Sequence, residues 1–75
     1  MKEHINMLVN LFEIWQKETN VGLLDCDKML ILTELNTEDK IIAFISNFRI
    51  LWEENNMPKT DYEIINLVCQ IAREN

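Results

Sequence analysis

The sequence predicts an all-α fold, a small four-helix bundle-like domain, from three observations. Apolar residues recur at helical spacing in separate segments of the chain. A single glycine and a single proline leave little to interrupt those segments. The length of 75 residues and a hydrophobic content of 48% suit one compact body rather than a disordered chain. We therefore expect residues 1–75 to form a single helical domain.

The first helix is expected over residues 4–18. Successive residues of a helix are about 100° apart, and on such a wheel the apolar side chains cover an arc of about 220°. They are Ile5, Met7, Leu8, Val9, Leu11, Phe12, Ile14 and Trp15. Asn20 and Gly22 are expected to end this helix, because both tolerate the left-handed conformation that follows many helix ends.

The second helix is expected at about residues 25–35, with Asp25 as its N-cap. Its apolar run, residues 29–32, points all round the wheel, so a buried strand is the alternative. We favour a helix, because no other segment offers a strand partner and a lone strand would leave its backbone groups unpaired.

The third helix is expected to begin near Asn36 and Thr37, a candidate cap that the acidic residues Glu38 and Asp39 follow. It should run to about Asn55. Its apolar residues occupy a narrower arc of about 120°, which is typical of an amphipathic helix with one buried face.

The fourth helix has the best-marked start in the chain. Thr60 and Glu63 have the spacing of a capping box, and Asp61 suits the positive end of the helix dipole. Arg73 lies in the last turn, where the dipole favours a cation. The apolar residues between them again cover an arc of about 220°.

The apolar arcs of the first and last helices are too wide for the core of one small domain. A surface helix needs an apolar stripe only somewhat wider than about 100°. A large exposed apolar patch usually marks an interface, so we expect a twofold homodimer through the first or last helix. A loosely amphipathic monomer is the alternative. The residues expected in the dimer interface are Met7, Leu11, Ile14, Trp15, Ile64, Leu67 and Ile71.

The two cysteines, Cys26 and Cys69, are expected to be small hydrophobic residues in the core. The N-terminus does not have the pattern of a signal peptide, and no segment reaches the roughly 18 apolar residues that a bilayer requires. We therefore expect a cytoplasmic protein with reduced thiols and no membrane partner. A disulfide between Cys26 and Cys69 is the alternative.

The residue inventory disfavours catalysis. One histidine and two cysteines are too few for the common metal sites, and one glycine is too few for a phosphate-binding loop. Cys26 could gain from a helix N-terminus, but Asp25 and Asp27 flank it and would repel a thiolate. We expect no catalytic residue, no cofactor and no metal, and hence no enzyme.

The stretch Gly22-Leu23-Leu24-Asp25-Cys26 resembles the Gly-Leu-Leu-Asp-Ser that precedes the second helix of some acyl carrier proteins. The resemblance implies a small acidic helical carrier. It covers five residues, and Cys26 stands where the carriers have the serine that holds phosphopantetheine. A carrier-like protein is therefore one alternative function.

A transcriptional regulator with a helix-turn-helix is a second alternative, suggested by the turn between the second and third helices. A net charge of −6 disfavours direct binding to nucleic acid. The helix that would read DNA begins with Glu38 and Asp39, which would repel phosphates.

The acidic residues gather in one part of the chain, and Lys28 is the only cation in that span. Such a cluster is suited to a partner with a basic surface, although it could also be a solvated face that keeps the protein in solution. The acids are Asp25, Asp27, Glu34, Glu38 and Asp39. We therefore expect a non-catalytic module that binds another protein, by analogy with small acidic regulators and inhibitors of bacteria and phages.

Overall fold

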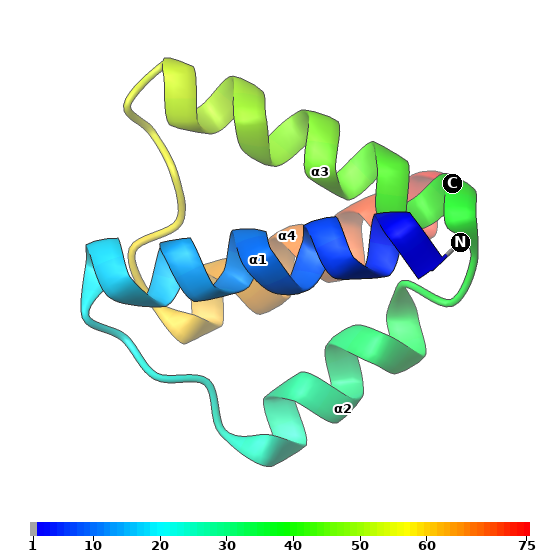
Figure 1. Cartoon of the computed structure of the whole chain (residues 1–75), viewed down its shortest axis with the longest axis horizontal. Helices are drawn as coiled ribbons and strands as arrows, with labels where there is room; N and C mark the ends of the chain where they lie inside the picture. The colour runs from blue at the N-terminus through cyan, green and yellow to red at the C-terminus, as the bar shows by residue number, and fades with distance from the viewer. Residues whose placement is uncertain (1) are drawn as a thin grey trace.

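The computed structural model describes residues 2–75, which form helices and no strand (Figure 1). The elements are α1 (Lys2–Thr19), α2 (Asp25–Glu34), α3 (Glu38–Glu53) and α4 (Asp61–Glu74). The predicted all-helical, bundle-like fold is confirmed, including the second helix. None of the described helices is both long and apolar enough to cross a bilayer.

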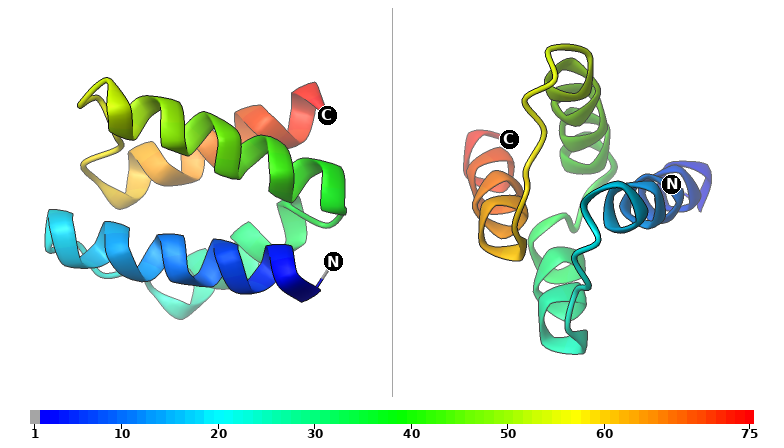
Figure 2. Two further views of the ribbon diagram at one scale, coloured as in Figure 1. Left: turned by 45° about the horizontal axis from the view of Figure 1, so that its top comes forward. Right: turned by 90° about the vertical axis from the view of Figure 1, so that its left-hand side faces the viewer.

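The helices pack as pairs around α3 and α4, which lie next to each other and run in opposite directions (Figures 1 and 2). α1 packs against α3, and α2 packs against α4. α4 therefore has a packed neighbour on each side, whereas α1 packs directly against α3 alone. The two wide apolar arcs are therefore covered to different extents, because two helices pack against α4 and only one packs against α1.

The core contains buried aromatic and aliphatic side chains from all four helices and from the loops on both sides of α2. The largest fully buried side chains are Trp15, Ile41, Phe44, Phe48, Ile64 and Val68. The rings of Phe12 and Phe44 are stacked with their centroids 5.5 Å apart. Trp15 also donates a hydrogen bond of 2.6 Å from Nε1 to the carbonyl oxygen of Pro58, which ties α1 to the loop between α3 and α4.

The helix ends follow from residues that accept a left-handed backbone. Asn20 has a φ of 58° directly after α1, as predicted, whereas Gly22 has no positive φ. Asn55 has a φ of 55°, and α3 ends before it at Glu53. The left-handed conformation at Asn55 thus stops α3 slightly earlier than the predicted end.

The start of α2 differs from the prediction. The N-cap position is Leu24, and Asp25 is the first residue of the helix, so the assignment of Asp25 as N-cap is wrong. The carboxylate of Asp27 accepts a hydrogen bond of 3.3 Å from the backbone N–H of Leu24. Asp27 therefore does the capping, and Asp25 lies exposed in the first turn.

The start of α4 largely follows the predicted capping box. The Thr60 hydroxyl accepts a hydrogen bond of 3.1 Å from the backbone N–H of Glu63. The Glu63 carboxylate accepts one of 2.7 Å from the N–H of Lys59, one residue earlier than in the standard arrangement. Each bond satisfies a backbone donor at a helix start that has no partner within the helix.

Replacing Thr60 with alanine is expected to lower the free energy of unfolding by about 1 kcal/mol, because the N–H of Glu63 loses its acceptor. Urea unfolding followed by circular dichroism measures the change. Thr33→Ala is the matched control, since the exposed Thr33 hydroxyl donates only to the Met29 carbonyl within α2. Equal losses in both variants would contradict the capping role of Thr60.

Candidate functional site: two apolar grooves beside α1

The surface is hollowed on both sides of α1. One hollow, with a volume of about 430 Å³, lies between α1 and α3 and is called the α1–α3 groove. The other, of about 260 Å³, lies between α1 and α2 and is called the α1–α2 groove. Both result from the wide apolar arc of α1, because its central side chains enter the core and its flanks line the grooves.

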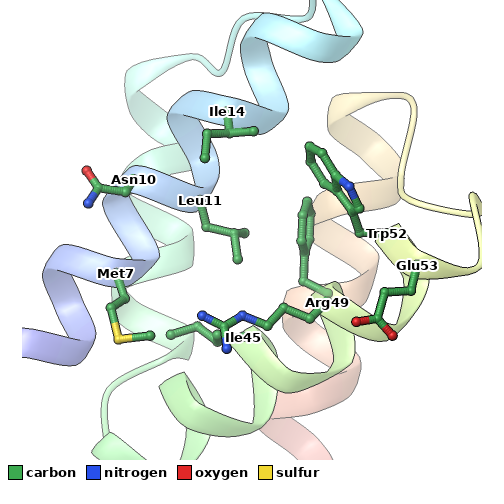
Figure 3. A pocket seen from close by; sticks show the side chains of 9 residues that line it. Met7, Asn10, Leu11, Ile14, Ile45, Arg49, Trp52 and Glu53 are labelled. Carbon is green, nitrogen blue, oxygen red and sulfur yellow. The ribbon is translucent and has the colours of Figure 1, made fainter.

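The α1–α3 groove has an apolar floor and a charged rim (Figure 3). Its lining residues are Met7, Asn10, Leu11 and Ile14 of α1 and Ile45, Phe48, Arg49, Trp52 and Glu53 of α3. Ile14 and Trp52 face each other from opposite walls, while Arg49 extends towards Met7 and Ile45. Aromatic residues, methionine and arginine are the types enriched at protein interfaces.

The two walls of this groove are joined at one end. His4 Nδ1 in the first turn of α1 lies 2.7 Å from Glu38 Oε1 at the start of α3, a contact that is an ion pair when the imidazole is protonated. From there α1 and α3 run in the same direction and diverge towards their C-terminal ends (Figure 1). The contact therefore anchors the end at which the helices are closest.

The α1–α2 groove is lined by apolar side chains that range from buried to exposed. Its lining residues are Ile5, Leu8, Val9, Phe12, Glu13, Gln16, Leu23, Lys28, Ile31 and Leu32. Gln16 holds the loop beneath it, since Gln16 Oε1 accepts a hydrogen bond of 3.2 Å from the N–H of Leu23. Leu23 and Ile31 are buried, whereas Val9 and Leu32 are 46% and 60% exposed. The groove thus has a fixed floor and an apolar rim.

Most of the apolar side chains of α2 are exposed to solvent. Ile31 is the only buried residue within it. The exposed side chains Leu24, Met29, Leu30 and Leu32 are called the α2 apolar face, and Met29 is 69% exposed. The run 29–32 surrounds the helix, and α4 is the only helix packed directly against α2, so most of the run remains in contact with solvent. This face continues into the α1–α2 groove through Leu32.

The predicted acidic cluster divides into two groups. Asp25 and Asp27 lie at the start of α2, while Glu34 ends α2 and Glu38 and Asp39 begin α3. An α-helix of ten residues is about 15 Å long, so α2 separates the groups by roughly that distance. Asp27 is used for capping and Glu38 contacts His4. Asp25 and Glu34 thus flank the α2 apolar face at its two ends.

The seven residues predicted for the dimer interface also divide. Met7, Leu11 and Ile14 line the α1–α3 groove. Leu67 is half-buried and lines a third hollow between α4 and the α3–α4 loop. Three of the seven are buried in the monomer core, with exposed fractions of 2% or less: Trp15, Ile64 and Ile71. The dimer interface itself stays a prediction.

Two further chemical features of residues 2–75 are their possible metal ligands and their thiols. No group of three or more histidine, cysteine or acidic side chains in this range could hold a metal ion. Cys26 and Cys69 are both free, so the alternative of a disulfide is not realised. The prediction that both lie in the core is wrong for Cys26, which is exposed on α2 because it points away from the neighbouring helix, whereas Cys69 is half-buried on α4.

Comparison of the chain with protein-family models, with curated proteins and with solved structures gives no match. The sequence pattern located the α1 wall of the α1–α3 groove but missed Arg49 and Trp52 on α3 and the whole α2 apolar face. A signal for the latter was present: an apolar run that surrounds a short helix can be buried only if neighbours cover that helix on all sides.

Proposed function

We propose that the protein is a non-catalytic module that binds another protein through α2 and the adjoining α1–α2 groove. The observation that carries this proposal is the α2 apolar face, where Leu24, Met29 and Leu32 are 63%, 69% and 60% exposed. Exposed apolar side chains gathered beside a groove are typical of a protein-binding surface. The α1–α2 groove would accept an apolar anchor of the partner.

The charges around this surface favour a basic partner. Asp25 is exposed at one end of α2 and Glu34 is half-buried at the other, while the last turn of α2 has no basic residue. Lys28 is the one cation of the helix. An acidic border around an apolar centre attracts a basic partner over a distance and repels acidic ones.

The two alternative functions receive less support. A carrier needs a hydroxyl for its cofactor, and the exposed residue at that position is Cys26. A DNA-reading α3 would direct the exposed Glu38 and Asp39 at phosphates, which would repel them. Binding to a protein fits the exposed residues of both helices better.

The double variant Met29→Gln and Leu32→Gln is expected to lose the partner in affinity capture from an extract of the source cell. The substitution removes apolar area while keeping charge and helix propensity, and side chains at the centre of an interface dominate its affinity. The measurement is the amount of the protein that wild-type bait retains, identified by mass spectrometry.

Ile14→Gln is the matched control, since Ile14 is 49% exposed but lines the α1–α3 groove. This variant should capture the same protein as the wild type. Loss of the protein with Ile14→Gln and retention with the α2 variant would move the partner site to the other side of α1. Retention of the protein by both variants would show that neither set of apolar contacts is needed for binding, which would contradict the proposal.

A further inference from the structure

The rim of the α1–α3 groove contains one charge of each sign. The two residues are Arg49 and Glu53, one helical turn apart on the same side of α3. Within residues 2–75 neither side chain forms an ion pair. The rim is therefore neutral as a whole although the chain has a net charge of −6. Two copies of so acidic a protein repel each other unless they meet at a locally neutral face.

The two opposite charges are also spaced for pairing across a twofold axis. When two copies of α3 pack antiparallel through the side that carries residues 49 and 53, with the axis at the level of residue 51, residue 49 of each lies opposite residue 53 of the other. Arg49 then meets Glu53 of the second copy, and Glu53 meets its Arg49, so one contact is made twice. Arginine with a carboxylate is the strongest of the common side-chain pairs, since the guanidinium can donate two parallel hydrogen bonds.

The apolar walls follow the same symmetry. The twofold axis keeps the same flank of α3 on the same side in both copies, so the α1 walls lie together beside the α3 pair. Ile14 and Trp52, 49% and 40% exposed, then form one apolar seam with their counterparts. A stable interface buries about 800 Å² per partner, about one sixth of the 5087 Å² surface of the monomer. Ile42, which is exposed two turns earlier on the same side of α3 as Arg49, extends the surface beyond the groove.

We propose that a second copy of this chain occupies the α1–α3 groove in a twofold dimer held by reciprocal Arg49–Glu53 pairs. This inference goes beyond the proposed function, because it uses the other side of α1 and leaves α2 free for the partner. The solution mass of the purified chain tests it without any partner.

The decisive experiment is a charge exchange followed by mixing. Arg49→Glu places two acids opposite two acids in its own dimer, and Glu53→Arg places two cations opposite two cations. Each variant alone should dimerise at least about tenfold more weakly than the wild type, because like charges are brought together. Mixed in equal amounts they should form a heterodimer, because one copy now has two acids where the other has two cations.

Sedimentation equilibrium reports each species, with about 18 kDa expected for the dimer of the 9.0 kDa chain at about 100 µM. Ile14→Glu should give a monomer and Val9→Glu a dimer. These variants are matched, since both residues are about half-exposed on α1 but line different grooves. Circular dichroism confirms that each variant is helical.

Three results would overturn the proposal: a wild-type monomer at that concentration, single charge variants that dimerise as well as the wild type, or folded charge variants that stay monomeric when mixed. None of these results bears on the partner of α2, so failure of the dimer and failure of the proposed function remain distinguishable.

Discussion

Replacing Trp15 with alanine is expected to lower the free energy of unfolding by about 3–5 kcal/mol, enough to unfold a domain of this size in part or completely. Trp15 has an exposed fraction of 0%, so its loss leaves a cavity in the core. The indole also donates the hydrogen bond to the Pro58 carbonyl. A domain of 75 residues has little other core with which to offset such a loss.

Trp15→Phe separates the two contributions of the indole. Phenylalanine retains most of the apolar volume but leaves the Pro58 carbonyl without its donor, and an unsatisfied buried group costs about 1–3 kcal/mol. Urea unfolding at fixed protein concentration measures both variants. Tyr62→Ala, at a residue that is 73% exposed, should change stability by no more than about 0.5 kcal/mol. A Trp15→Ala variant as stable as Tyr62→Ala would refute this position of Trp15 in the core.

The sequence predicts which face of each helix is apolar, but not how these faces pack into a core. The periodicity identified the apolar arcs of α1 and α4 but not which part of each arc is covered. That depends on the neighbours, and α4 has α2 and α3 on its two sides whereas α1 packs directly against α3. Ile64 and Ile71 are consequently buried within the monomer, while Met7 and Ile14 remain 38% and 49% exposed.

Helix starts and ends were predicted more accurately than the core, because they depend on single residues and the backbone next to them. Thr60 caps α4 and Asn20 ends α1, as their chemistry predicts. The start of α2 was predicted less well, because Asp25 and Asp27 can both cap a helix and the sequence does not distinguish them. The structure assigns capping to Asp27, and this leaves Asp25 exposed.

The candidate site lay beyond sequence reasoning for a related reason. Each groove lies between two helices, and the sequence does not show which helices lie side by side. The walls of each groove therefore combine residues that are distant in the sequence. Trp52 and Ile14 are an example, since no periodicity within either helix indicates that they face each other (Figure 3). The acids of α2 could be identified from the sequence, but the predicted single cluster is divided by the length of the helix.

Charge reversal at Asp25 and Glu34 is expected to slow association with the partner of α2 by about 10-fold or more at low salt, because electrostatic steering can raise association rates by about 10- to 1000-fold. Both residues border the α2 apolar face, and the double variant Asp25→Lys and Glu34→Lys makes that border basic. The difference from the wild type should shrink as salt is added, since the Debye length falls from about 10 Å at 0.1 M to about 3 Å at 1 M.

The matched control is Glu54→Lys with Glu74→Lys, which reverses two exposed acids outside α2. Each reversal adds two charges, so both double variants change the net charge from −6 to −2. An effect of total charge would slow both variants alike, whereas steering towards α2 would slow only the first. Stopped-flow association with the captured partner at several salt concentrations distinguishes these cases.

The fold should survive the reversal at α2, so that a slower rate reports on association. Lysine at position 25 opposes the positive end of the helix dipole, while lysine at position 34 favours the negative end. Each effect is at most about 1 kcal/mol at an exposed site and about 2 kcal/mol at a partly buried one. The two effects have opposite signs and therefore offset each other. Unchanged helical circular dichroism combined with an unchanged association rate across low and high salt would place the partner away from α2.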